Sequence, residues 1–252
     1  MALRHIPAVD RRLARCDTVC VAGTFAQGPY MGFAELHLQF AGRVAAVLGL
    51  GLHEALRTWT PACRLSGCEW DHGDAPDARM LARAYALQLA SYAHRPGVGC
   101  FAYQLEDAGR TLRLHFSATR HAGALKPAHL EQRRGELLAV LDHARAAHPG
   151  VRQVRGGSWL YNLPGYRALF PPAVLAAAVP ADPRDELEFM ALWGQFLRGD
   201  ATLYQPSAAT FRQRFSVARD ERGLLAAFPL PKLDWQAPIA QIDAWLSHGA
   251  RA

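Results

Sequence analysis

Apolar residues in the first third of the chain recur at steps of three and four, the period of a helix with one buried face. These positions are Phe33, Leu36, Phe40, Val44, Val47 and Leu48. Gly49 and Gly51 end the pattern, and a second, short helix is predicted over residues 53–59. A third helix is predicted from Pro76 to a point before Pro96. We therefore expect a mainly helical N-terminal part.

The middle third changes to the two-residue period of strands. Residues 98–106 and 110–119 are predicted strands, and the turn-like Asp107-Ala108-Gly109 between them predicts a β-hairpin. The second strand has an apolar face of Leu112, Leu114, Phe116 and Ala118. Its opposite, polar face carries Thr111, Arg113, His115, Ser117 and Thr119. A long helix from Pro127 to about Pro149 and a strand over residues 151–162 follow.

The last third is helical and interrupted by prolines. A helix is predicted to start at Asp182 and Pro183, with Leu187, Met190, Trp193 and Leu197 on its inner face. Ser207 is expected to cap another helix through Phe215, and Pro238 to begin a last one. This order predicts an α+β or mixed α/β fold with a small central sheet flanked by helices. We divide it into residues 1–96, mainly helical, and residues 97–252, a mixed part of sheet and helices that is expected to form one compact unit with the first.

Composition narrows the class of protein further. Of the 252 residues, 50% are hydrophobic and 20% are charged, which excludes a disordered chain or a disulfide-dense miniprotein. Arg4 and Arg11 are not followed by the apolar run of a secretory signal, and the chain has no apolar stretch near the ~20 residues that span a bilayer. We expect a cytoplasmic protein without a membrane span.

The formal net charge is +6, and all but two of the 28 Lys and Arg residues are arginines. The two lysines are Lys126 and Lys232. The arginines are scattered along the chain, whereas nucleic-acid binders usually concentrate positive charge on one face. The sequence therefore argues against a nucleic-acid partner, and it points to no particular oligomeric state.

The five cysteines do not form a recognisable metal site. Cys63, Cys68 and His72 lie close together in an Asp-rich segment, but their spacing does not match a zinc knuckle. Ordinary exposed turns have the same composition, so we expect no metal there. Cys100 lies in an apolar strand pattern and is predicted to belong to the core.

Two segments carry candidate functional residues. In the first, His115 lies on the polar strand face, and Arg120 and His121 lie where this strand runs into a loop. Active sites of open sheets gather at strand ends, and a histidine there can serve as a general base. The alternative is a solvated sheet face on which one of 11 histidines happens to lie.

The second segment runs from Arg155 to Tyr166. Gly156 and Gly157 permit a close backbone approach, and Ser158, Tyr161 and Asn162 supply hydroxyl and amide groups before a Pro-Gly turn. The serine lacks the surroundings of a nucleophile elbow. The alternative is a core strand packed by Trp159 and Leu160.

From about Leu112 to Trp235, the order of features resembles the C-terminal part of bacterial proteins described as GNAT-like acyltransferases. The matching pieces are the strand at Leu112, the helix from Pro127, Ser158-Trp159-Leu160, Leu169-Phe170-Pro171-Pro172, the helix over 186–197, and Pro206–Phe215 with Gly223-Leu224-Leu225. The resemblance implies a mixed sheet flanked by helices and acyl transfer from a thioester donor. Coenzyme A is the donor that GNAT enzymes use, through a loop of the form Gln/Arg-x-x-Gly-x-Gly/Ala that leads into a helix.

The nearest match to that loop is Gln153-Val-Arg-Gly156-Gly157-Ser158, which ends in serine and leads into a strand pattern. We therefore carry no catalytic residue over from the family.

The residues themselves suggest a small-molecule enzyme, with acyl transfer as the expected reaction. His115 or His121 would serve as the base, with Ser158 and Tyr161 at the reacting carbonyl. Arg120, Arg155, Gly156, Gly157 and Asn162 would bind the cofactor. This arrangement requires His115 and Ser158 to lie within about 10 Å of each other in one pocket.

The alternative is a non-catalytic binding or assembly protein. It would use a surface of arginines and exposed aromatic residues, which are enriched at protein interfaces. The aromatic residues are Trp159, Tyr161, Tyr166, Trp193 and Trp235.

Overall fold

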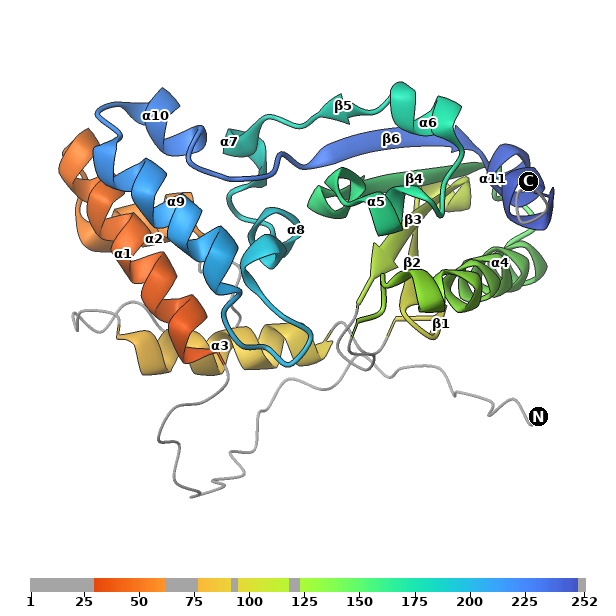
Figure 1. The fold of residues 1–252 in the computed structure, drawn as a ribbon, viewed down its shortest axis with the longest axis horizontal. Coiled ribbons are helices and arrows are strands. Elements are labelled where there is room, and N and C mark those ends of the chain that lie inside the picture. Colours follow the sequence, from red (N-terminus) through yellow and green to blue (C-terminus); the bar gives the residue numbers. More distant parts are fainter. Residues whose placement is uncertain (1–29, 62–76, 92–94, 118–122, 249–252) are drawn as a thin grey trace, which may run out of the picture.

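The structure is a computed structural model that describes residues 30–61, 77–91, 95–117 and 123–248. Within these ranges the chain forms eleven α-helices, short 3₁₀ helices and one six-stranded sheet, so the fold is α+β, as predicted (Figure 1). The α-helices are α1 (Met31–Leu48), α2 (Leu52–Trp59), α3 (Ala78–Ser91), α4 (Leu130–Ala147), α5 (Pro164–Arg167), α6 (Pro172–Ala176), α7 (Pro183–Glu186), α8 (Met190–Trp193), α9 (Gln205–Val217), α10 (Glu221–Leu225) and α11 (Ile239–His248). The strands are β1 (Gly97–Val98), β2 (Phe101–Glu106), β3 (Thr111–Phe116), β4 (Gln153–Ser158), β5 (Val179–Pro180) and β6 (Leu233–Pro238).

The sheet has the strand order β1-β2-β3-β4-β6-β5. Its one parallel pair is β3 and β4, and α4 makes the crossover between them that a parallel pair requires. The other neighbouring strands are antiparallel. The predicted hairpin between β2 and β3 is confirmed, and its turn, η4 (Asp107–Gly109), has positive φ at all three residues.

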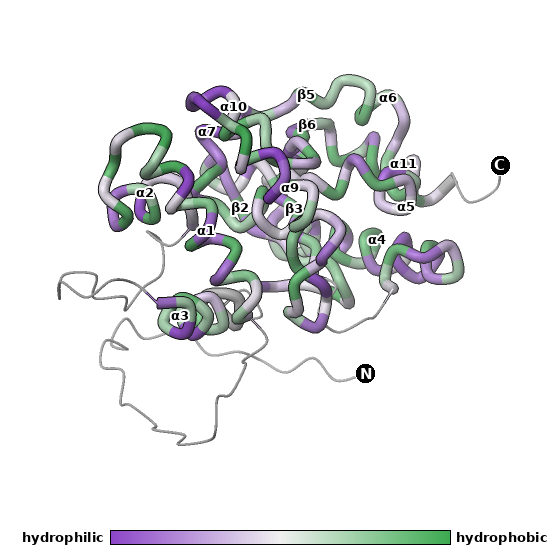
Figure 2. The backbone as a smooth tube through the Cα atoms, turned by 60° about the vertical axis from the view of Figure 1, so that its left-hand side comes forward, coloured by the Kyte–Doolittle hydropathy of each residue, from purple (hydrophilic) through white to green (hydrophobic). Residues whose placement is uncertain are grey.

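Two hydrophobic cores stabilise the molecule. One lies between the sheet and the helices α4, α5, α6 and α11, and it contains Leu112, Val154, Tyr161, Phe170 and Trp235. The other is all-helical and contains side chains from α1, α2 and α3 together with side chains from residues 187–228. Hydrophobic and hydrophilic residues alternate along α1 and α4, as expected for helices with one buried face (Figure 2).

The helical core does not follow the division expected near Pro96. The segment between β5 and β6 leaves the sheet, forms α7 to α10 and packs against the N-terminal helices (Figure 1). Phe211 of α9 thus lies 4.9 Å from Phe40 of α1, measured between ring centroids. The helical part of the molecule is therefore built from the N-terminal helices and from the segment between β5 and β6.

Most predicted elements are present, and two predictions were wrong in detail. The strand expected over residues 151–162 ends at Ser158, where the backbone turns into η6 (Trp159–Asn162). The helix expected over residues 186–197 is broken into α7, α8 and η7 (Gly194–Phe196). The strands β5 and β6 were not predicted, and the helix α11 begins one residue after Pro238.

Candidate functional site

The two faces of the sheet differ in chemistry because successive side chains of a strand point to opposite sides. Leu112 and Leu114 of β3 lie on the face that packs against α4 and α11, with Val154, Trp235 and Ala237 of the neighbouring strands. The opposite face is polar and is defined here as Gln104, Glu106, Arg113, His115, Arg155, Asp234 and Gln236. The predicted alternation in β3 therefore continues across four strands.

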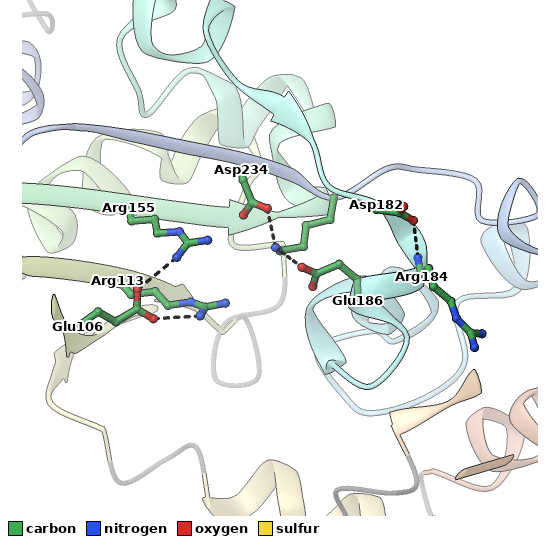
Figure 3. A network of polar contacts seen from close by, with 8 residues as sticks. Glu106, Arg113, Arg155, Asp182, Arg184, Glu186 and Asp234 are labelled. Atoms are coloured by element: carbon green, nitrogen blue, oxygen red, sulfur yellow. Dashed lines mark hydrogen bonds and ion pairs between the residues drawn. The ribbon is translucent and has the colours of Figure 1, made fainter. Parts of the chain in front are cut away.

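Two arginines on this polar face share one carboxylate. Arg113 and Arg155 stand directly opposite each other in the parallel pair, where like charges repel. Glu106 Oε1 is 3.0 Å from Arg113 Nη1, and Glu106 Oε2 is 3.6 Å from Arg155 Nη1 (Figure 3). The side chain of Arg155 is 43% exposed, so its guanidinium remains open to solvent.

Lys232 forms a second charged group beside the first. Its ammonium lies 2.7 Å from Glu186 Oε1 and 2.8 Å from Asp234 Oδ2, and its side chain is 3% exposed (Figure 3). A compact ammonium fits this site, whereas the planar fork of an arginine has a different shape. The contact joins β6 to α7 and leaves the three groups with one excess negative charge.

The glycine pair of β4 allows bulky groups to approach both faces of the strand. A Cβ on Gly156 would collide with Tyr161 Oη and would lie 2.6 Å from the Trp235 ring. A Cβ on Gly157 would collide with Asp234 Oδ1 and would lie 3.0 Å from Lys232 Cε. Gly156 and Gly157 stand opposite Trp235 and Asp234 in the register, which explains why each glycine accommodates that neighbour.

His115 lies half-buried on the polar face, and its Nε2 atom is buried without a hydrogen-bond partner among the residues that the structure describes. Burial, with a smaller contribution from the positive charges of Arg95 and Arg113, lowers the pKa of His115 to about 3. The imidazole is therefore neutral near pH 7 and is a weak proton acceptor. Asp234 Oδ1 is likewise buried and unpartnered. Both atoms need polar partners, because an unpaired buried polar group is costly.

The parallel strands β3 and β4 separate near these residues. β3 pairs with β2 over its whole length, and β4 pairs with β6 over its whole length. The two strands pair with each other only over Thr111–Arg113 and Gln153–Arg155. In Figure 1, β2 and β3 accordingly run steeply across the view, while β4 and β6 run nearly horizontally. Residues 114–116 and 156–158 therefore diverge at the carboxyl ends of the two strands.

Several of the predicted site residues have structural roles instead. Ser158 Oγ accepts a hydrogen bond from the Leu160 N–H and so caps η6. Asn162 donates to the carbonyl oxygens of Trp159 and Pro231. Tyr161 is buried among Tyr166, Phe170 and Trp235, and burial raises the pKa of its hydroxyl well above the usual value.

The expected pairing of His115 with Ser158 was wrong. Arg113 and Arg155 share one face, so strand alternation places His115 on that face and Ser158 on the opposite face. A sheet therefore lies between the two side chains. His121 and Arg120 lie outside the described residues, as do Cys63, Cys68 and His72.

The expected aromatic surface was also wrong. Tyr161, Tyr166, Trp193 and Trp235 are each 5% exposed or less, and Trp159 is half-buried. Nor does the open pocket beside β2, which has a volume of about 370 Å³, contain any predicted site residue. Its lining residues are Arg95, Pro96, Tyr103, Gln104, Leu105 and His148.

Sequence reasoning did not propose Glu106, Arg113, Lys232, Glu186 or Asp234 as site residues. The alternation of β3 already placed Arg113 beside His115, and the rarity of lysine marked Lys232. Asp234 lies opposite Gly157 only because β6 pairs with β4, and β6 was not predicted from the sequence.

The site thus consists of a charged face on a mixed sheet, next to the point where its two parallel strands separate. No known family model matches the chain, and neither a curated protein nor a solved structure is detectably similar to it. None of the helices in the described ranges is long and apolar enough to cross a membrane. Within the same ranges, no three His, Cys, Asp or Glu side chains form a metal-binding group.

Proposed function

We propose that this protein transfers an acyl group from a thioester donor, and that the donor lies between the diverging carboxyl ends of β3 and β4. The observation that carries the proposal is the loss of pairing between these strands after Arg113 and Arg155. Ligands of open sheets bind outside the carboxyl ends of parallel strands, and this sheet has one such pair.

The diverging strand ends favour an extended ligand that carries amide groups. Backbone N–H and C=O groups that do not pair within a sheet require other hydrogen-bond partners. An extended chain with its own amides can supply them, in the manner of a peptide added to a sheet edge. The pantetheine arm of coenzyme A is a chain of this kind, and its thioester would supply an activated acyl carbon with a thiol leaving group.

Two described residues just before α4, Gly123 and Lys126, suit an anionic donor. Gly123 has a φ of +70°, and a Cβ there would lie 2.8 Å from Lys126 Cε. The glycine thus lets the lysine side chain fold over the backbone, close to the start of α4. A cation near a helix N-terminus is suited to bind the phosphates of coenzyme A.

The residues of the polar face would position the acceptor rather than form a covalent intermediate. His115 is neutral near pH 7, so its role would be to hydrogen-bond the acceptor beside the acyl carbon. Ser158 and Tyr161 have no part in this proposal because the first caps η6 and the second lies in the core.

Calorimetric titration with coenzyme A and acetyl-coenzyme A tests the proposal. We expect binding, and we expect Lys126→Ala to weaken it about tenfold, which corresponds to ~1.4 kcal/mol. Arg219→Ala, at an exposed position between α9 and α10, is the matched control and should leave the affinity unchanged. Absence of binding by either thiol or thioester at millimolar concentration would overturn the proposal.

A further inference from the structure

The polar face is positively charged at one end and negatively charged at the other, so it suits a ligand that carries both charges. We infer that the face binds a small amino carboxylate, with the carboxylate at Arg155 and the ammonium at Asp234. The role of this molecule as the acyl acceptor rests on the proposed function. The binding site itself is inferred from the geometry of the polar face alone.

The positive end is formed by Arg113 and Arg155. The two guanidinium groups share Glu106, so together the three residues carry one excess positive charge. Glu106 is nearer to Arg113, at 3.0 Å, and its 3.6 Å distance to Arg155 exceeds a hydrogen bond. Arg155 is thus the arginine whose N–H groups are available to a ligand. A guanidinium group binds a carboxylate through two parallel hydrogen bonds.

The negative end is formed by Asp234, Glu186 and Lys232. Asp234 Oδ2 is paired with Lys232, but Oδ1 is buried and has no partner. This oxygen occupies the space that a side chain on Gly157 would fill, so it lies above β4 and is displaced toward β3. An ammonium on that side would donate to Oδ1 and would cancel the excess negative charge.

The spacing of the two ends selects the length of the ligand. Arg155 and Gly157 are two residues apart on β4, so their Cα atoms lie roughly 6–7 Å apart along the strand. We take this spacing as the length of the ligand, and an amine and a carboxylate joined by about four carbons, as in 5-aminopentanoate, span a comparable distance. The polar face therefore discriminates by the distance between charges as well as by their signs.

The nitrogen of such a ligand would lie where β3 and β4 diverge. His115 lies on the β3 side and Asp234 Oδ1 on the β4 side, and both present unpartnered buried atoms. In the reaction, the ammonium loses one proton to solvent and its nitrogen bonds to the acyl carbon. The carbon–sulfur bond then breaks, and the second proton released from nitrogen passes to the thiolate. The products are an N-acyl amino carboxylate and a free thiol.

Binding of four matched probes tests the inference in the absence of any donor. The probes are 5-aminopentanoate, pentylamine, pentanoate and 1,5-diaminopentane, titrated by calorimetry or by ligand-observed NMR. We expect 5-aminopentanoate to bind at least tenfold more tightly than the other three. Equal affinities, or a preference for the diamine, would overturn the inference.

Two variants assign the two ends. Arg155→Gln should reduce the affinity for 5-aminopentanoate to that of pentylamine, and Asp234→Asn should reduce it to that of pentanoate. The asparagine keeps an oxygen for Lys232, and a thermal melt shows whether each variant is folded. Arg222→Gln, on the exposed surface of α10, is the control and should bind like the parent protein.

The two proposals fail separately. If coenzyme A binds but the four probes are not distinguished, acyl transfer stands and the amino carboxylate site is wrong. If 5-aminopentanoate binds with the expected dependence on Arg155 and Asp234 but coenzyme A does not bind, the site stands and acyl transfer is wrong.

Discussion

At the scale of single residues, the chemistry of this sheet depends on side chains that are absent. Gly156 leaves room for Tyr161 and Trp235 on the apolar face, and Gly157 leaves room for Asp234 and Lys232 on the polar face. The glycine pair therefore allows aromatic core residues to pack closely on one face of β4 and charged residues to pack closely on the other. This requirement is steric, since neither residue has a positive φ.

Gly156→Ala is expected to destabilise the protein by about 1–3 kcal/mol, the usual cost of overpacking a core. The new methyl group would meet a buried tyrosine and a buried tryptophan, neither of which has space to move away. Gly135→Ala in α4 is the control, because a Cβ there meets nothing within 4 Å. It should stabilise by about 0.5–1 kcal/mol. Urea denaturation measures both changes, and equal effects would contradict the steric explanation.

His37 makes stability depend on pH. It is buried between Phe33, Tyr85 and Trp193, and burial lowers its pKa to about 3, although its hydrogen bond to the Phe33 carbonyl oxygen opposes this. Between pH 6.5 and pH 3, the unfolded chain takes up a proton that the folded chain does not, so stability falls as the pH falls. The stabilisation is complete above pH 6.5.

Replacing His37 with leucine should remove the His37 part of this dependence, while the part from His115, whose pKa is also lowered to about 3, should remain. As the pH falls from 6.5 to 3, the free energy of unfolding of the parent protein should decrease by up to about 1.4 kcal/mol more per pH unit than that of His37→Leu. This difference in slope does not depend on the absolute stability of the variant. The free energy of unfolding at several pH values between 7 and 4 gives the two slopes. A slope in His37→Leu parallel to that of the parent would refute the assignment.

At the scale of elements, a buried ion pair within α4 fastens this helix to the β1–β2 turn through hydrogen bonds to Cys100. Arg133 Nη2 is 2.7 Å from Glu136 Oε1, and its Nη1 donates to Cys100 Sγ at 2.6 Å. Glu136 Oε2 in turn accepts from the backbone N–H of Cys100 at 2.9 Å. Burial raises the pKa of the Cys100 thiol, with opposing effects from Arg133 and Glu136. Cys100 is thus a core residue, as the sequence predicted.

Arg133→Met should cost about 3–5 kcal/mol, because it leaves the Glu136 carboxylate buried without its cation. Glu131→Gln is the comparison, since the pair of Glu131 and Arg134 lies at the surface and should contribute no more than about 1 kcal/mol. The double variant Arg133→Met, Glu136→Met should recover much of the loss, because no unpaired charge remains. Thermal melts measure all three, and a double variant as unstable as Arg133→Met would count against an electrostatic cause.

At the scale of the whole molecule, two distant segments make one helical core. Phe40 of α1 packs against Trp59 of α2 and also against Trp193, Phe211 and Phe228 of the segment between β5 and β6. Neither segment buries its apolar face without the other. Since the second segment is anchored in the sheet at both ends, its packing ties the helical core to the sheet.

A double-mutant cycle tests this arrangement. Phe40→Ala and Phe211→Ala should each cost about 3–5 kcal/mol, and the two should be coupled by about 0.5–3 kcal/mol because their rings are in contact. Phe40→Ala combined with Leu141→Ala, whose side chain lies in the other core, should show additive costs. Additivity in the first pair would contradict a shared helical core.

The hydrophobic pattern determined the local elements, because helix and strand periods are properties of neighbouring residues. It placed the N-terminal helices, the hairpin and α4, and it placed Arg113 and His115 on one polar strand face. It failed where partners are distant in the chain. β6 ends in a proline and buries only Trp235 and Ala237, so it was not recognised from its own pattern. Its pairing with β4 brings Asp234 and Lys232 over Gly157.

The same limit explains the misplaced candidates. Ser158 and His115 belong to adjacent parallel strands, and only the register, which depends on long-range packing, decides that they point to opposite faces. The sequence by itself therefore determined most of the local helices and strands, with the exception of β5, β6 and the broken helix over residues 186–197, and it showed which residues are chemically unusual. The tertiary structure alone decided which of those residues meet, because strand order and register are set by the burial of the whole apolar face.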